Sequence, residues 1–273
     1  MPLYCLARLL ISIRARLMLL ALLGRGPRGP MMCAADDGGS TFERLMAVYE
    51  QEFEKLASQH ALLPLPGGER LAIGLGSLAD CDTGGRVWNS AAVLCKWLSS
   101  ADIRGRSVLE LGCGTGAVGL YSAALGAKRV TLTDGGSAKL LALAAANARA
   151  NSALWSGTGT EVGVLPHAWG EPAGDQPALC GHDWILASDV TYSARAHGAL
   201  CSSLAAQLRL HSPGARVVIG HQQRHEPGDE TETDERLLGF VAAAEANGMD
   251  VRTMCSETDR GGRRVCLLRV DLP

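Results

Sequence analysis

Residues 107 to 134 read SVLELGCGTGAVGLYSAALGAKRVTLTD, and this stretch decides the fold. It opens with a short apolar segment, 108–111, of the kind that forms a buried strand. Glycine then recurs at alternate positions, at Gly112, Gly114 and Gly116. Because glycine has no Cβ, the backbone can turn sharply there and approach a ligand closely. We therefore predict a strand, a glycine-rich turn, a helix from about Thr115, and a second strand that ends at Asp134.

Asp134 adds a carboxylate to this pattern. Ligands of an open parallel sheet bind outside the carboxyl ends of its strands, so the glycine turn and Asp134 should face one crevice. A carboxylate there can accept hydrogen bonds from both hydroxyls of a ribose, which indicates a nucleotide-type cofactor site. A dinucleotide also fits, because Gly112, Gly114 and Ala117 satisfy a relaxed G-x-G-x-x-A pattern with an acidic residue about 20 positions further on.

Glu110 favours one of these two cofactors. Its carboxylate stands shortly before the first glycine, where it can meet a cationic or amine-bearing ligand. S-adenosylmethionine carries an amine and a sulfonium and has no pyrophosphate. The position of Glu110 therefore favours S-adenosylmethionine over a dinucleotide.

The segments E-L-G-C-G-T-G (110–116) and T-L-T-D (131–134) resemble the first two motifs of the seven-strand, class I S-adenosylmethionine-dependent methyltransferases. Four further segments extend the resemblance, over about residues 84 to 270, to the protein-lysine methyltransferase family sixteen, of the methyltransferase-like 21 type. These are G-R-V-W (85–88), Asn147 with Asn151, A-W-G (168–170) and D-W-I-L-A-S-D-V-T-Y (183–192). The most family-specific element is D-x-x-Y, which here runs from Asp189 to Tyr192.

The resemblance implies a Rossmann-like α/β fold: a doubly wound, seven-stranded, mostly parallel sheet with an antiparallel last strand. The order of the predicted elements agrees with this architecture. Further strands are predicted at 161–168, 184–187, 216–220, 251–255 and 265–270, and helices at 87–98, 137–150, 194–210 and 232–247. A tight D-R-G-G turn at 259–262 joins the last two strands.

Pattern and resemblance together predict the residues of the site. Those expected at the cofactor are Trp88, Glu110, Gly112, Cys113, Gly114, Asp134, Trp169 and Ser188. For Trp88 the alternative is a core residue buried against the sheet. At the acceptor, Asp189 is expected to orient the amine or relay its proton, and Tyr192 to offer a ring face and a hydroxyl.

The function that the resemblance implies is a protein-lysine N-methyltransferase. Its reaction is an in-line displacement at the sulfonium methyl, so the site must align the acceptor and keep its amine neutral. A lysine amine with a pKa of about 10.4 is almost fully protonated at neutral pH. Two other classes stay open: a methyltransferase of small molecules, and a catalytically idle cofactor-binding module that binds partners.

The composition of the 273 residues, 47% hydrophobic and 20% charged with a formal net charge of −2, is typical of one catalytic domain. This near-neutral balance gives no electrostatic basis for nucleic acid, so we expect a protein partner. We also expect a monomer. The nine cysteines form no C-x-x-C pair and indicate reduced thiols. His221 and His225 lack the glutamate of H-E-x-x-H, and we predict no metal site.

Two further sets of polar residues can support the fold rather than contact a ligand. Asn147 and Asn151 lie on one face of the predicted helix at 137–150, near its end, and we expect them to satisfy backbone groups. Arg224 resembles a family arginine that follows the fifth strand. Its role is either support of the fold or contact with the substrate.

The chain before the catalytic region has two parts. Residues 1–39 form a basic leader with five arginines in its first 30 residues and no acid before Asp36. It is either an organelle targeting segment or sequence upstream of a start at Met31 or Met32. We therefore expect a cytoplasmic protein, or a mitochondrial or plastid one if residues 1–30 are a transit peptide. Residues 40–83 form an extension with an amphipathic helix at 40–59 and a short strand at 71–75, and the methyltransferase domain follows at 84–273.

Overall fold

The computed structural model describes residues 59–172, 176–224, 234–258 and 263–273. The chain divides into two compact units, Met1–Gln59 and His60–Pro273, and every described helix and strand belongs to the second. The basic leader, the amphipathic helix predicted at 40–59 except for its last residue, and the D-R-G-G turn lie outside the described residues.

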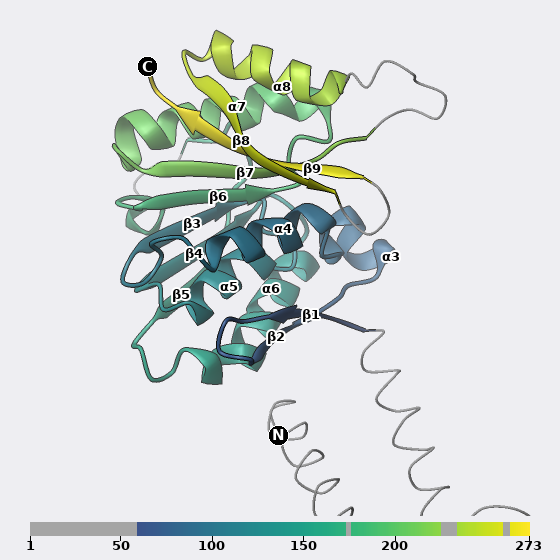
Figure 1. Cartoon of the computed structure of the whole chain (residues 1–273), viewed down its shortest axis with the longest axis vertical. Helices are drawn as coiled ribbons and strands as arrows, with labels where there is room; N and C mark the ends of the chain where they lie inside the picture. The colour runs from purple at the N-terminus through teal and green to yellow at the C-terminus, as the bar shows by residue number, and fades with distance from the viewer. Residues whose placement is uncertain (1–58, 173–175, 225–233, 259–262) are drawn as a thin grey trace, which may run out of the picture. The chain divides into compact units, whose positions relative to one another are not determined.

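A seven-stranded sheet forms the centre of the second unit (Figure 1). Its strands are β3 (Ser107–Leu111), β4 (Arg129–Asp134), β5 (Glu161–Pro166), β6 (Trp184–Ser188), β7 (Arg216–Gln222), β8 (Asp250–Thr258) and β9 (Arg264–Asp271). They lie in the order β5-β4-β3-β6-β7-β9-β8. The first five pair in parallel, and β9 pairs antiparallel with both β7 and β8. The predicted mostly parallel sheet with an antiparallel last strand is therefore confirmed.

Helices cover both faces of this sheet (Figure 1). On one face lie α4 (Asn89–Leu98), α5 (Ala117–Ala124) and α6 (Ala138–Asn151), and on the other lie α7 (His197–Ala206), which a π-helical turn at Gln207–His211 extends, and α8 (Glu235–Ala246). Neighbouring residues of a strand contribute to opposite faces, so Val108 belongs to the first hydrophobic cluster and Leu109 to the second. The buried runs that predict the central strands reflect this double coverage.

The sheet changes its winding direction between β3 and β6. From β3 the chain moves outward through β4 to β5, and then returns to place β6 on the other side of β3. The carboxyl ends of these two strands border the crevice that such a topological switch creates. In register, Glu110 lies beside Leu186 and Leu111 beside Thr133, so the glycine turn, Asp134 and the end of β6 meet at one edge.

A two-stranded hairpin precedes the sheet. It consists of β1 (His60–Pro64) and β2 (Arg70–Gly74), of which the sequence predicts only the second. Asn147 accepts from the backbone N–H of Gly74 at 2.8 Å and donates to its carbonyl at 3.1 Å. Asn151 does the same at Ala72, at 3.1 and 2.8 Å. The two amides of α6 therefore have the predicted structural role. Most of their backbone partners lie far away in the sequence, although Asn151 also donates to the nearby carbonyl of Asn147 at 2.8 Å.

Two short helices, α3 (Leu78–Cys81) and the 3-10 turn η1 (Asp82–Gly85), connect this hairpin to α4. The side chain of Ser77 caps α3 by accepting from the backbone N–H of Asp80 at 3.2 Å. Further 3-10 turns occur at η2 (Ser152–Leu154), η3 (Pro177–Leu179) and η4 (Ala194–Ala196). In the described ranges, no helix is long and apolar enough to cross a membrane.

Candidate active site

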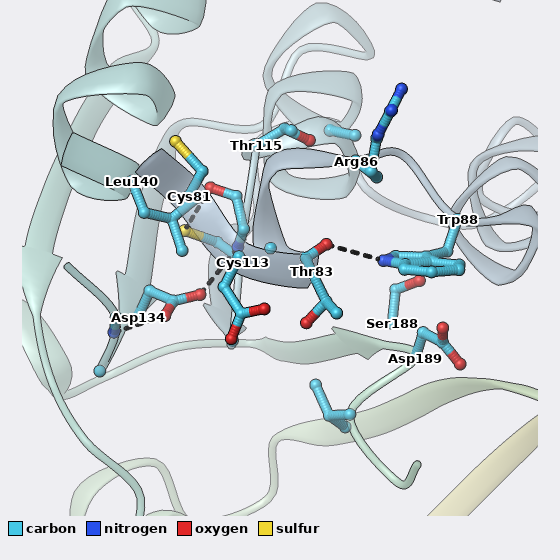
Figure 2. Close-up of a pocket in the computed structure, with 18 of the residues that line it drawn as sticks. Cys81, Thr83, Arg86, Trp88, Cys113, Thr115, Asp134, Leu140, Ser188 and Asp189 are labelled. Atoms are coloured by element: carbon cyan, nitrogen blue, oxygen red, sulfur yellow. Dashed lines mark hydrogen bonds between the residues drawn. The ribbon is translucent and has the colours of Figure 1, made fainter. Parts of the chain in front are cut away.

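A pocket of about 740 Å³ opens at the carboxyl ends of β3, β4 and β6. Its volume falls in the range of about 300 to 1,000 Å³ that is usual for small-molecule sites. All ten residues predicted for the site line this pocket, namely Trp88, Glu110, Gly112, Cys113, Gly114, Asp134, Trp169, Ser188, Asp189 and Tyr192. Figure 2 shows Asp134 at one end of the pocket and Trp88, Ser188 and Asp189 together at the other.

The glycine turn requires glycine for two reasons. Gly112 and Gly114 have φ angles of 67° and 52°, in the left-handed region that side chains disfavour. A Cβ on Gly112 would lie 2.6 Å from Cζ2 of Trp169, and one on Gly114 would lie 2.7 Å from the carbonyl oxygen of Gly84. The turn is thus packed between the Trp169 ring and η1, which leaves its backbone on the pocket wall.

Asp134 is held in position by the same turn. Its Oδ2 accepts from the backbone N–H of Gly114 at 2.9 Å, and its Oδ1 accepts from that of Gly136 at 2.7 Å. Each carboxylate oxygen has a second lone pair for a ligand. The side chain is therefore preorganised on the pocket wall, as a contact to ribose hydroxyls requires.

Glu110 is almost fully buried. One of its oxygens, Oε2, accepts from the backbone N–H of Gly119 in α5 at 2.8 Å. Burial raises the pKa of Glu110 to about 8, and the negative charge of Asp134 adds to the rise, while the hydrogen bonds from Gly119 and Val118 oppose it. A nearby cation would favour the ionised form, so Glu110 has the chemistry expected of a residue that faces a positively charged ligand.

The thiol of Cys113 is also buried in the pocket wall. Burial raises its pKa well above the ordinary value, and the negative charges of Glu110 and Asp134 act in the same direction. The thiol therefore stays protonated, and a protonated thiol is a poor nucleophile. The buried thiol therefore suits a contact with a ligand, as the sequence predicts for Cys113, rather than nucleophilic catalysis.

Trp88 begins α4 and lies at the mouth of the pocket. Its side chain is 36% exposed, and its indole N–H donates to the carbonyl of Thr83 at 3.1 Å (Figure 2). This exposure excludes the alternative of a core tryptophan. Nearby, the hydroxyls of Ser188 and Ser90 lie 3.0 Å apart and join the end of β6 to α4.

Asp189 follows β6 with a φ of 56°, an uncommon conformation for a residue with a side chain. Its backbone N–H donates to the carbonyl of Gly220 at 2.8 Å, which holds this turn against β7. The carboxylate is buried, and its Oδ2 forms an ion pair with Nη2 of Arg224. Its Oδ1 is buried and has no hydrogen-bond partner within the described residues. Such strained residues with unpaired polar atoms cluster at functional sites.

Arg224 joins the predicted acceptor residues. The Cζ atom of its guanidinium lies 5.6 Å from the centroid of the Trp88 ring and 5.9 Å from that of Tyr192, whose side chain is 46% exposed. Both distances allow a cation–π contact. The sequence leaves Arg224 between support of the fold and substrate contact, and the structure brings it against Asp189 and both aromatic rings.

One wall of the pocket is missing from the sequence prediction. It consists of α3 and η1, where Leu78, Asp80 and Gly84 are among the lining residues. The signal that marks this segment is the capping spacing between Ser77 and Asp80, which indicates the start of a helix before the predicted one at 87–98.

His221 is buried and hydrogen-bonded to neighbouring side chains, as expected of a residue that supports the fold. Its ring nitrogens lie 2.6 Å from Oγ1 of Thr191 and 2.8 Å from Oδ2 of Asp234, and all three residues are buried. His225 lies outside the described residues. In the part of the chain that the structure describes, no group of three or more His, Cys, Asp or Glu side chains is arranged to hold a metal ion.

The fold and the pocket define a class: a doubly wound domain with a nucleotide-type cofactor site at its switch point. The profile of the lysine methyltransferase family matches residues 72–234, more than half of the chain. The chain belongs to the lysine methyltransferase family. Its cofactor is S-adenosyl-L-methionine, and the pocket fits this molecule. The carboxylate of Asp134, held by the N–H of Gly114, fits a ribose, and the buried Glu110 fits a cationic group. The glycine turn allows the backbone to approach the ligand closely.

Individual relatives agree with the family. The chain is 36% identical over 154 residues to the protein N-lysine methyltransferase METTL21A of Danio rerio, which covers 56% of the chain and 64% of the relative. It is 32% identical over 149 residues to the EEF1A lysine methyltransferase 3 of Mus musculus, covering 54% and 59%. The chain thus spans about three fifths of the length of these curated relatives. The protein N-terminal and lysine N-methyltransferase efm7 of Aspergillus fumigatus is 24% identical, covering 78% and 81%.

Proposed function

We propose that this protein is a protein-lysine N-methyltransferase that transfers a methyl group from S-adenosylmethionine to a lysine side chain of a protein partner. The observation that carries the proposal is the acceptor end of the pocket. There the buried Oδ1 of Asp189 has no partner among the residues that the structure describes, and the exposed rings of Trp88 and Tyr192 line the same pocket. A carboxylate in a pocket that aromatic rings also line suits an amine.

At the cofactor end, each residue has a role that its position supports. Asp134 would bind the ribose hydroxyls, and Glu110 would face the cationic groups of the cofactor. Trp169 would lie at the adenine, and Trp88 and Ser188 at the methionyl part. When bound, S-adenosylmethionine supplies an activated methyl group on a sulfonium.

The chain's own residues would then act on the acceptor. Lysine arrives as an ammonium, whose nitrogen has no lone pair for the displacement. The Oδ1 of Asp189 would accept one N–H, orient the nitrogen and help its proton leave toward solvent. The ring of Tyr192 would hold the amine, and its hydroxyl would fix the direction of the lone pair. The site thus works by alignment and proton removal, and it needs no covalent intermediate.

The relatives support an amine on a protein as the acceptor. Two of them are named as methyltransferases of protein lysines, and the third as one of protein N-termini and lysines. These names also make the α-amine of a protein N-terminus the most specific competing acceptor.

The test is to incubate the purified full chain with a cell lysate and S-adenosylmethionine carrying an isotopic label in its methyl group. Label in a protein band that hydrolyses to methyl-lysine supports the proposal. Label in a small-molecule fraction points to the alternative of a small-molecule methyltransferase, and label on an N-terminal amine points to that acceptor. If no label is transferred although the cofactor binds, the protein is a cofactor-binding interaction module.

We further propose that the protein acts as a monomer in the cytoplasm and binds no nucleic acid. The near-neutral net charge of −2 supports the last point. Fluorescent fusions with and without residues 1–30 test the location. A mitochondrial or plastid signal that requires these residues would show that they are a transit peptide.

A further inference from the structure

The acceptor end of the pocket already holds a cation. The guanidinium of Arg224 contacts the carboxylate of Asp189 and lies near the rings of Trp88 and Tyr192. The proposed function assigns Asp189 and Tyr192 to the acceptor amine and Trp88 to the methionyl part of the cofactor beside it, and the inference below rests on that proposal. A guanidinium and an alkylammonium carry the same charge, and both are attracted to carboxylates and to aromatic faces.

The ion pair between Arg224 and Asp189 is only half formed. An arginine and a carboxylate can form two parallel hydrogen bonds. Here Nη2 bonds to Oδ2, whereas Nη1 of Arg224 and Oδ1 of Asp189 are both buried and lack a partner in the described ranges. An unmet donor and an unmet acceptor make this pair weaker than a bidentate one. A lysine ammonium has three donors and can satisfy both oxygens of Asp189.

The side chain of Arg224 can move while its backbone stays in place. Its backbone N–H donates to Oδ2 of Asp234 at 3.3 Å, and its carbonyl accepts from Nη1 of Arg236 at 3.2 Å. The side chain is 26% exposed, so a rotation of its flexible stem takes the guanidinium into water. The carboxylate that it would leave behind is fixed by the turn after β6, where the N–H of Asp189 bonds to Gly220.

We propose that the guanidinium of Arg224 occupies the place of the acceptor ammonium, and that the acceptor lysine must displace it to reach Asp189. Arg224 is then a specificity-determining residue. It keeps the acidic acceptor end neutral and closed to small cations until a lysine with further contacts to the protein surface replaces it. Binding of the acceptor and retention of the Arg224–Asp189 pair exclude each other.

The test compares Arg224→Gln, which keeps a hydrogen-bond donor for Asp189 and removes the competing cation, with Arg224→Lys, which keeps a cation. Thermal unfolding first selects variants that fold. The substrate is a protein or peptide that wild type methylates. With it, Arg224→Gln should lower the KM for the acceptor roughly tenfold, which is the size of one charge-assisted interaction, without lowering kcat. Arg224→Lys should leave this KM within a few fold of wild type.

A binding experiment needs no turnover. In the presence of S-adenosylhomocysteine, n-butylammonium should bind to Arg224→Gln roughly tenfold more tightly than to wild type, measured by calorimetry. The neutral analogue n-butanol should show no such difference. Arg216→Gln is the matched control, because Arg216 begins β7, the strand after which Arg224 follows, and its Cζ lies 5.2 Å from the ring of Trp184, away from this pocket.

The two experiments separate the proposals. If Arg224→Gln binds n-butylammonium no more tightly than wild type, or if it raises the KM or lowers kcat, Arg224 stays in place during catalysis and the displacement is refuted. If wild type labels no protein lysine but n-butylammonium binds preferentially to Arg224→Gln, the proposed function fails while the displacement of Arg224 by an amine stands.

Discussion

Glu110 and Gly119 form a carboxylate–amide contact across the β3–α5 interface: Oε2 of Glu110 accepts from the Gly119 N–H at 2.8 Å. Glycine at 119 makes the contact possible, because a Cβ there would lie 2.8 Å from that oxygen and 2.2 Å from a methyl carbon of Leu132. The contact anchors Glu110 in a buried position where its pKa rises to about 8. At neutral pH the free protein therefore holds a proton on this group.

The raised pKa of Glu110 predicts how stability depends on pH. The ordinary pKa is 4.5, so between about 4.5 and 8 the folded state binds more protons than the unfolded state. Stability should fall as the pH rises through this window. Urea unfolding at pH 5.5, 7 and 8.5 should therefore show wild type losing stability relative to Glu110→Gln, which keeps an acceptor for Gly119. A difference between the two proteins that stays constant with pH would contradict the assignment.

The same group predicts that cofactor binding releases a proton. The cationic groups of S-adenosylmethionine favour the carboxylate and lower the pKa of Glu110 in the complex. Affinity should accordingly increase as the pH rises toward 8. Calorimetry at pH 7 in buffers of different ionisation enthalpy should report proton release by wild type and none by Glu110→Gln. Equal proton release by both proteins would assign the proton to another group.

Asp134 should determine cofactor affinity. Asp134→Ala removes a charged acceptor, and hydrogen bonds to such groups contribute about 1.5 to 3 kcal/mol, so affinity for S-adenosylmethionine should fall about ten- to a hundredfold. The loss includes the looser glycine turn, because Asp134 also binds the N–H of Gly114 and of Gly136. Calorimetry on folded protein measures it. Asp102→Ala is the control, since the side chain of Asp102 pairs with the exposed side chain of Arg106 and does not line this pocket. Unchanged affinity in Asp134→Ala would refute the ribose assignment.

The hairpin β1–β2 should depend on the two asparagines of α6. Asn147→Ala leaves the N–H and carbonyl of Gly74 and the carbonyl of Thr115 without this partner, and Asn151→Ala does the same at Ala72. Unsatisfied buried groups cost about 1 to 3 kcal/mol, so each variant should lose stability of that order in urea unfolding. The exposed Ser156→Ala, which removes only a local bond, should stay within about 0.5 kcal/mol of wild type. A loss no larger than this in Asn147→Ala would show that the hairpin is held by apolar packing.

The sequence predicts the sheet well because its signals are local. The strand β6 is a short apolar run, β5 has valines at alternate positions, and the glycine turn and Asp134 lie within one continuous stretch. The strand β1 is different, since His60–Pro64 is short, ends in proline and has no clear alternation. It becomes a strand by pairing with β2. The strand β2 is in turn held by Asn147 and Asn151 of α6, and a local sequence pattern does not predict these long-range contacts.

The sequence predicts which residues share one pocket, but not the protonation or the contacts of their side chains. All ten predicted residues reach one pocket because parallel strands end at one edge. The buried state of Glu110 depends on the packing of α5, and the partner of Asp189 is 35 residues away in the sequence. Contacts of this kind depend on the order of β6 and β7 in the sheet, which residue types alone do not specify.

The last prediction separates acceptor chemistry from cofactor binding. Asp189 and Tyr192 follow β6 and line the pocket, and Figure 2 shows Asp189 at the opposite end from Asp134. Asp189→Asn and Tyr192→Phe should therefore leave the affinity for S-adenosylmethionine within a few fold of wild type and reduce methylation of a protein lysine. Asp189→Asn replaces the carboxylate that accepts a hydrogen bond from the ammonium and helps its proton leave. Turnover should therefore fall by about a hundredfold or more.

Tyr192→Phe should have the milder effect, because it keeps the ring and removes only a hydroxyl, whose hydrogen bond contributes about 0.5 to 1.5 kcal/mol and hence up to about tenfold in rate. Turnover with a confirmed protein substrate and cofactor affinity are to be measured for each variant, with thermal unfolding as the check on folding. If both variants methylate at the wild-type rate, the D-x-x-Y element is structural in this protein. The lysine proposal then loses its most specific support, whereas the fold and the cofactor pocket are unaffected.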